Sequence, residues 1–172
     1  MKFRLLFLFF ILTVVVFSCG KKNDRHQESA ETAYPVLTGW LNEHALMAEI
    51  PEMGLEKQRY QPDIAAVTAL KNYNNSVNIL VMLGSWCSDS RREVPRFLKV
   101  MDEVHNGNIR YEMYGLDRGK RDSIGLGEKN QIEFVPTFIV FNEMGEIGRI
   151  VETPIFSIEQ DLAEILAETI ID

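Results

Sequence analysis

The sequence VNILVMLGSWCSDS, residues 77–90, decides the fold. Its first half is an apolar run of β-forming residues, which predicts a strand buried on both faces of a sheet. Gly84 and Ser85 interrupt this run. From residue 94 onward, apolar residues recur at intervals of three and four, which predicts a helix with one buried face that reaches Val104. Cys87 therefore stands where a central strand passes into the N-terminus of a helix.

This position predicts thiolate chemistry at Cys87. Helix N-termini carry unpaired backbone N–H groups and the positive end of the helix dipole, which favour a thiolate over a thiol. Ser90 can donate a hydrogen bond to that thiolate from the next turn, whereas Asp89 opposes it by like charge. The positive charges of Arg91 and Arg92 partly offset the charge of Asp89. The sequence does not fix the net shift in the pKa of Cys87. For Asp89, a structural role at the start of the helix is preferred to catalysis.

The N-terminus has the pattern of a bacterial secretory signal. Lys2 and Arg4 precede the apolar segment 5–17, which is short for a membrane span. Residues 16–19, VFSC, resemble a bacterial lipobox, in which the cysteine becomes the lipidated first residue of the mature protein. We therefore expect residues 1–18 to be a signal peptide and Cys19 to carry a lipid that anchors the protein to the bacterial cell envelope, outside the cytoplasm. A conventionally cleaved signal and an uncleaved anchor helix are the alternatives.

Composition and charge limit the function. The 172 residues include 18 basic and 25 acidic side chains, for a net charge of −7, and this acidic balance argues against nucleic-acid binding. An apolar content of 46% suffices for one ordinary globular core and not for two large ones. Residues 19–33 are polar and charged without an apolar period, so we expect a flexible tether between the lipid and the fold.

The number of cysteines limits which disulfides this protein can form. If Cys19 carries lipid, Cys87 is the only thiol of the mature protein, and no internal disulfide can form. In an oxidising compartment, such a thiol is either buried and inert or exchanges with another molecule. The three histidines, at positions 26, 44 and 105, show no ligand spacing with a cysteine. We therefore expect no metal site and no bound cofactor.

The regions on either side of the opening stretch predict further elements. In residues 34–76 we expect a helical extension that covers one side of the sheet. One helix lies within residues 37–50 and stops at Pro51, and a second begins at Pro62. The C-terminal part predicts a strand over residues 109–113, a loop with a short helix over 117–130, a hairpin of strands at 138–141 and 147–151, and a last helix that opens with a capping box at 157–160.

This order of strand, helix, strand, hairpin and helix resembles the thioredoxin superfamily. Trp86 directly precedes Cys87, Pro95 lies eight residues after the cysteine, and Val135-Pro136-Thr137 matches the cis-proline segment of that family. The resemblance implies a thioredoxin-like domain over residues 77–172, with the fold class α/β and the architecture of a three-layer α/β/α sandwich, preceded by the helical extension. The alternative for Pro136 is an ordinary trans proline at the start of a strand.

The sequence departs from this family at two positions. The family resolves its mixed disulfide with a second cysteine three residues after the first, where this chain has Ser90. Release of a mixed disulfide requires another thiolate, and a serine oxygen cannot form a disulfide. Val81 occupies the position at which thioredoxins carry a buried aspartate that assists the resolving thiol. Both changes argue against ordinary reductase turnover by this chain alone.

The resemblance implies catalytic positions at Cys87 and Ser90, and a docking edge for a substrate strand at Trp86, Val135 and Pro136. We interpret the protein as a membrane-tethered monothiol protein in thiol-disulfide exchange. Cys87 exchanges with a disulfide-containing protein or a small-thiol substrate, and an external thiol resolves the product, which suits isomerase-like chemistry better than net reduction. The alternative is a non-catalytic module that retains the fold and its peptide groove.

Overall fold

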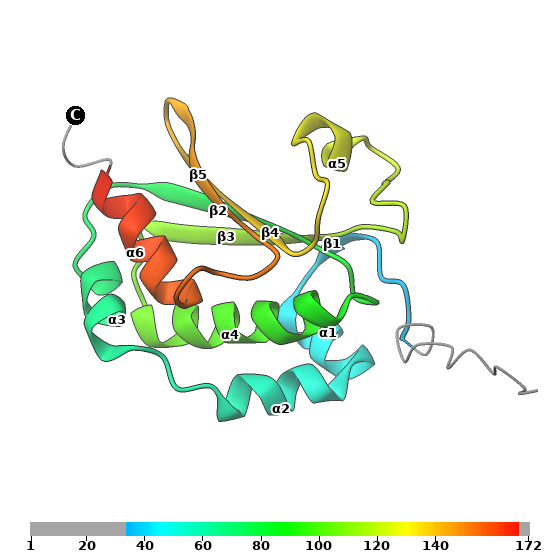
Figure 1. The fold of residues 1–172 in the computed structure, drawn as a ribbon, viewed down its shortest axis with the longest axis horizontal. Helices are drawn as coiled ribbons and strands as arrows, with labels where there is room; N and C mark the ends of the chain where they lie inside the picture. The colour runs from blue at the N-terminus through cyan, green and yellow to red at the C-terminus, as the bar shows by residue number, and fades with distance from the viewer. Residues whose placement is uncertain (1–33, 169–172) are drawn as a thin grey trace, which may run out of the picture.

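The computed structural model describes residues 34–168. The predicted signal peptide, the tether and the lipidation site Cys19 lie outside the described residues. A five-stranded sheet carries the helices mainly on one side, and the predicted α/β fold class is confirmed (Figure 1). The elements in chain order are β1 (Gly39–Leu41), α1 (Glu43–Glu49), α2 (Pro51–Arg59), α3 (Ile64–Lys71), β2 (Val77–Leu83), α4 (Ser88–Val104), β3 (Ile109–Gly115), α5 (Leu126–Lys129), β4 (Thr137–Asn142), β5 (Gly145–Val151) and α6 (Ile158–Glu168).

Strand β2 is the centre of the sheet, whose order is β1-β3-β2-β4-β5. It runs parallel to β3 and antiparallel to β4, and β4 and β5 form the predicted hairpin. In the first half of β2, Ile79 is buried, but Asn78 is exposed and Leu80 is only half-buried. The prediction of a strand buried on both faces therefore holds for the C-terminal half of β2, which leads to Cys87.

The helices on one side of the sheet form two tiers (Figure 1). Helix α4 lies along the sheet beside α6, and α2 and α3 pack on the outside of these two helices. Alternate side chains of the strands meet the apolar face of α4, which produces the main core. Its fully buried members include Ile79, Val81, Phe97, Leu98, Phe138 and Val140. None of the helices in residues 34–168 is long and apolar enough to cross a membrane.

The opposite face of the sheet is covered only in part. Helix α5 and its loop lie over the C-terminal ends of β2 and β3, where a smaller apolar cluster includes Met82, Tyr114 and Ile139. Toward the other end of these strands the face is open, and a groove of about 860 Å³ is lined by Trp40 and Phe141 among others. Within residues 34–168, the third layer of the predicted sandwich therefore consists of α5 and its loop.

The segment before β2 contributes a strand as well as helices. The helix predicted within residues 37–50 is present as α1, which begins only at Glu43, and the residues before it form β1, which pairs antiparallel with β3. The Asn42 side chain sets this boundary, because it accepts a hydrogen bond from the Ala45 backbone N–H and caps the helix. Three residues are too few to show an alternating pattern, and sequence reasoning therefore missed this strand.

Helix α2 was also missed. The first helix stops before Pro51, as predicted, but Pro51 is also the first residue of α2, where its fixed φ and missing N–H are tolerated. The helix that follows Pro62 is confirmed as α3. Its cap is Asp63, whose side chain accepts a hydrogen bond from the Ala66 N–H.

Candidate functional site

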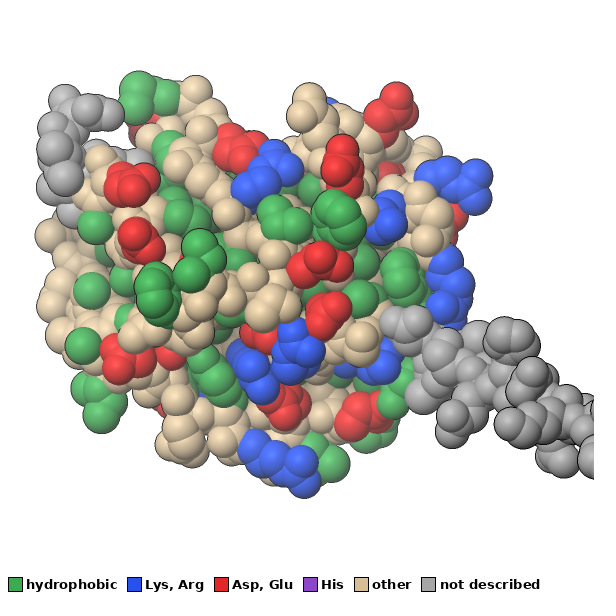
Figure 2. Space-filling model, in the orientation of Figure 1, with side chains coloured by type: hydrophobic (Ala, Val, Ile, Leu, Met, Phe, Trp, Pro, Cys, Tyr) green, Lys and Arg blue, Asp and Glu red, His purple; other side chains and the backbone are tan. Residues whose placement is uncertain are grey.

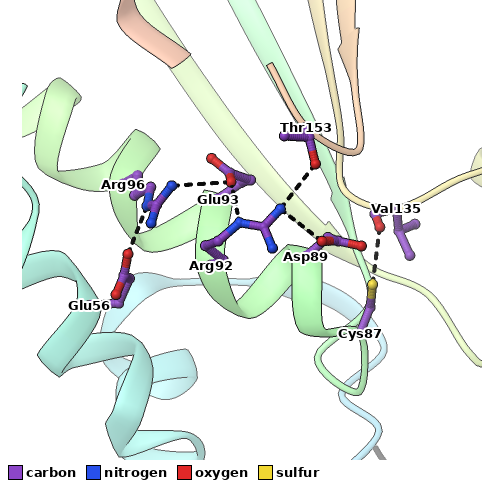
Figure 3. Close-up of polar contacts among 8 residues, drawn as sticks. All are labelled: Glu56, Cys87, Asp89, Arg92, Glu93, Arg96, Val135 and Thr153. Carbon is purple, nitrogen blue, oxygen red and sulfur yellow. Dashed lines mark hydrogen bonds and ion pairs between the residues drawn. The ribbon is translucent and has the colours of Figure 1, made fainter. Parts of the chain in front are cut away.

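Cys87 is the N-cap residue of α4 and follows directly on the turn that ends β2. Its backbone N–H donates to the Gly84 carbonyl at 2.9 Å, which closes this turn. The side chain is only 7% exposed, and Sγ donates a hydrogen bond to the Val135 carbonyl at 3.2 Å (Figure 3). The predicted junction between strand and helix is therefore present, with the thiol turned toward a distant segment of the chain.

The Ser90 side chain forms its hydrogen bond with the turn before Cys87 and not with the Cys87 thiol. It is fully buried, and its Oγ accepts a hydrogen bond from the Gly84 N–H at 3.1 Å. In residues 34–168, the side-chain hydrogen bond of Cys87 goes to Val135 and that of Ser90 goes to Gly84. Ser90 thus fixes the backbone that leads to Cys87.

The segment opposite Cys87 contains the cis peptide bond between Val135 and Pro136 that the resemblance implies. Two hydrogen bonds fix this segment. Thr137 Oγ1 donates to the Phe134 carbonyl at 2.8 Å, and the Glu152 N–H donates to the Pro136 carbonyl at 2.7 Å. Val135 and Pro136 are themselves buried, so it is the half-exposed Phe134 that meets solvent at this point.

Trp86 lies on the other side of Cys87 and is half-buried. Its Nε1 donates to the Leu116 carbonyl at 3.1 Å. The ring lies so close to Gly84 that a Cβ at position 84 would approach it to 2.7 Å, which accounts for the glycine there. The Arg118 guanidinium lies 5.5 Å from the ring centroid. The structure thus brings Trp86, Val135 and Pro136 together around Cys87.

The two arginines near Cys87 have different partners. Arg91 stacks on the Tyr34 ring at 3.6 Å and donates to the Trp86 carbonyl at 2.7 Å, so it anchors the N-terminal segment. Arg92 pairs with Asp89, with Nη2 2.8 Å from Oδ1. Of the two cations expected to offset the charge of Asp89, Arg92 is the one in direct contact with it.

Arg92 also belongs to a network that sequence reasoning missed (Figure 3). Its Nε lies 2.6 Å from Oε1 of Glu93, and its Nη2 donates to Thr153 Oγ1 at 3.0 Å. Burial alone would lower the pKa of Arg92, but the hydrogen bond and charge of Glu93, together with Asp89, outweigh it and raise that pKa. Thr153 follows Arg92 by 61 residues, and no sequence pattern connects the two.

Glu93 is a buried carboxylate, only 1% exposed, in the middle of α4. Arg96 also contacts its Oε1 at 3.4 Å and pairs with Glu56 of α2 at 2.7 Å. A buried charge is costly unless it is paired, and here two guanidinium groups share the pairing of Glu93. This arrangement fixes the position of the Arg92 side chain beside the site.

The loop between β5 and α6 is held in place while its apolar side chains stay exposed. The Asp161 carboxylate accepts hydrogen bonds from the backbone N–H groups of Ile155 at 2.7 Å and Phe156 at 3.1 Å. The side chains of these two residues are 83% and 73% exposed. Figure 2 shows apolar side chains over this loop. Large apolar side chains displayed on a fixed loop are typical of a binding surface.

Comparisons with known proteins identify a family and similar folds. A family model described as thioredoxin matches residues 52–164. No curated protein matches the chain. Among solved structures, the crystal structure of an HIV epitope-scaffold is 17% identical, covers 77% of this chain and 94% of its own, and has a TM-score of 0.56. A protein of unknown function from Pseudomonas aeruginosa is 19% identical, with coverages of 74% and 78% and a TM-score of 0.49. The first of these likenesses is one of fold alone.

Proposed function

Because this chain belongs to the thioredoxin family, we propose that it performs thiol-disulfide exchange through a single thiol, that of Cys87. The observation that carries the proposal is the contact between Cys87 Sγ and the Val135 carbonyl, directly before Pro136. It supports a site in which one thiol faces a backbone segment able to hold a substrate strand. Within residues 34–168, Cys87 is the only cysteine.

The exchange proceeds in two steps. Cys87 loses its proton to solvent, and its thiolate attacks one sulfur of a substrate disulfide, while the other sulfur leaves with the electron pair as a thiolate. An external thiolate then attacks the mixed disulfide, regenerates the Cys87 thiolate and takes the substrate as a new disulfide. The net result exchanges one partner of a disulfide for another. The external thiol is required because the buried Ser90 cannot form a disulfide.

The hydrogen bond of Cys87 supports a link between thiolate formation and substrate docking. A thiol can donate to the Val135 carbonyl, but a thiolate has no proton to donate. Loss of the proton therefore frees this carbonyl for a backbone N–H of a substrate strand. The exposed apolar side chains of Phe134, Ile155 and Phe156 supply contact area on the same end of the sheet.

Capture of a disulfide tests the proposal. Incubation of the reduced protein with an excess of a small disulfide should add one half of that disulfide to Cys87, as seen by intact mass spectrometry and peptide mapping. The Cys87→Ser variant should gain no mass. A wild-type protein that keeps a free thiol at Cys87 under these conditions would contradict the proposal.

A non-catalytic binding module is the second candidate. It is favoured by the low exposure of Cys87 and by the serine at position 90, because both reduce the reactivity of the site in the free protein. Under this function, Cys87→Ser should retain the affinity for a partner, and covalent capture should be absent from the wild type as well.

We also propose that the domain is anchored to the outside of a bacterial membrane by a lipid on Cys19, after removal of residues 1–18. The support is the sequence alone, namely the charged and apolar N-terminus that ends at VFSC. Metabolic labelling with a radioactive fatty acid should mark the wild type and leave Cys19→Ala unlabelled. Equal labelling of the two proteins would exclude this anchor.

A further inference from the structure

We propose that Arg92 is a positioning residue that holds the loop after β5 against the first turn of α4 and thereby shapes the docking surface for polypeptide disulfides. The inference rests on the proposed function of Cys87 and names a specificity device within that site. Arg92 affects how well a polypeptide substrate binds, and it does not take part in the reaction of the Cys87 thiol.

The guanidinium group of Arg92 contacts three side chains. Nη2 of Arg92 lies 2.8 Å from Asp89 Oδ1 and 3.0 Å from Thr153 Oγ1 (Figure 3). Asp89 belongs to the first turn of α4, next to Cys87, and Thr153 belongs to the loop after β5. Nη2 contacts both of these groups while Nε of the same planar guanidinium pairs with Glu93, and the compact ammonium of a lysine cannot span all three positions.

A buried carboxylate fixes the Arg92 side chain. The Nε of Arg92 lies 2.6 Å from Glu93, which is buried and is also paired with Arg96. A swing of the Arg92 side chain away from the loop would weaken the pairing of a buried carboxylate, which is unfavourable. Arg92 is therefore held in the orientation in which it reaches Thr153.

Thr153 lies between two other attachments of its loop. Glu152, the residue before it, donates its N–H to the Pro136 carbonyl, and Asp161 holds the backbone of Ile155 and Phe156. The loop after β5 is thus attached at three places. The cis-proline segment holds Glu152, α4 holds Thr153 through Arg92, and α6 holds Ile155 and Phe156. A loop fixed in this way binds a polypeptide with less loss of conformational entropy.

The consequence is a difference between large and small substrates. A polypeptide disulfide can contact both Cys87 and the exposed side chains of this loop, whereas a small disulfide contacts the neighbourhood of Cys87 alone. Loss of the Arg92 bridge should therefore slow the reaction with polypeptides selectively. A change in the reactivity of the thiolate itself would instead change both reactions by the same factor, because both depend on the same thiolate.

The test compares two disulfides that release the same coloured thiolate, thionitrobenzoate. The small substrate is dithiobis(nitrobenzoate). The large substrate is a short peptide with one cysteine between two leucines, and this cysteine forms a mixed disulfide with thionitrobenzoate. The second-order rate constants of release are measured for wild type, Arg92→Lys and Thr153→Val. We expect the peptide rate to fall about tenfold in Arg92→Lys and about fivefold in Thr153→Val, with the rate for the small disulfide within about twofold of wild type.

The controls use the same substitutions away from the site. Thr68→Val removes an exposed hydroxyl that donates to the Ile64 carbonyl in α3, and Arg110→Lys alters an exposed arginine of β3. Both should keep the wild-type ratio of the two rates. An unchanged peptide rate, an increased one, or an equal fall of both rates in the Arg92 and Thr153 variants would overturn the inference. A wild type that releases thionitrobenzoate from neither disulfide would instead contradict the proposed function itself.

Discussion

At residue 90, the Ser90 oxygen accepts a hydrogen bond from the Gly84 N–H, three residues after Cys87, at the position where the sequence resemblance predicts the second cysteine of the family. This contact gives the serine a structural reason to be there, because a buried backbone N–H without a partner costs free energy. With serine at this position, residues 34–168 contain no second thiol that could resolve a mixed disulfide on Cys87. One side chain thus stabilises the turn and, under the proposed function, makes the exchange depend on an external thiol.

Ser90→Cys should return a resolving thiol to the site. Mild oxidation of this variant should form an internal disulfide with Cys87, because the two positions have the spacing of the family's cysteine pair. Thiol titration before and after oxidation measures this change, and it should show the loss of both thiols. Persistence of two free thiols in the oxidised variant would show that the serine position is not equivalent to the resolving position.

Gly84→Ala should destabilise the turn before Cys87. The new Cβ would lie 2.7 Å from the Trp86 ring, so the ring must move out of its place beside the site. We expect a loss of about 1–3 kcal/mol in the free energy of unfolding, measured by urea denaturation. Gly107→Ala is the matched control, since a Cβ there meets nothing within 4 Å. Equal stabilities of the two variants would contradict the described packing of Trp86.

At the scale of elements, the loop around α5 is organised by one carboxylate. Asp122 accepts hydrogen bonds from the backbone N–H groups of Ile124, Leu126 and Gly127, and another from the Tyr114 hydroxyl. Burial alone would raise the pKa of Asp122, but these hydrogen bonds outweigh it and lower the pKa. The loop that covers the second face of the sheet therefore depends on an ionised side chain.

This loop should loosen in acid. A carboxyl whose pKa is lowered by folding stabilises the folded state at pH values above its unfolded pKa, here 3.8, and this contribution is lost as the pH falls from there through the lowered folded pKa. Hydrogen exchange of the Gly127 amide should be slow at pH 6 and become faster, relative to its intrinsic rate, as Asp122 is protonated. In Asp122→Asn the protection should be weak at both pH values. Equal protection of this amide in the variant and the wild type at pH 6 would rule out this role of Asp122.

At the scale of the whole molecule, the segment before β2 is part of the domain rather than an appendage. The side chains of Leu46, Ile50 and Met53 are fully buried in the same core as α4 and β2. Glu159 of α6 accepts hydrogen bonds from the Tyr60 hydroxyl at 2.9 Å and from the Asp63 N–H at 2.8 Å. These contacts connect the segment between α2 and α3 with the last helix.

A fragment of residues 77–172 should therefore not fold as the longer chain does. It would expose the apolar surfaces of α4 and α6 that α2 and α3 cover, and it would lose β1. Thermal unfolding followed by circular dichroism should show a cooperative transition for residues 34–172 and none for residues 77–172. A cooperative transition at a similar temperature in the shorter fragment would mean that the first helices are dispensable.

The sequence predicted the α/β fold class because strong local signals mark it: the apolar run of β2, the amphipathic helix α4 and the hairpin after Pro136. It missed β1 and α2, since a three-residue strand and a helix with a weak apolar face give little periodicity. At the site, the sequence identified Cys87 and the segment opposite it. It could not connect Arg92 with Thr153 or detect the burial of Glu93, because both depend on packing between distant segments.

The lifetime of a mixed disulfide on Cys87 tests the central claim most directly. The peptide adduct of the wild-type protein is formed, freed of excess reagent, and followed by intact mass spectrometry with and without an added monothiol. We predict that the adduct persists without the thiol and disappears at a rate proportional to thiol concentration, because residues 34–168 contain no second cysteine. Release of the peptide at the same rate in the absence of any external thiol would contradict single-thiol exchange.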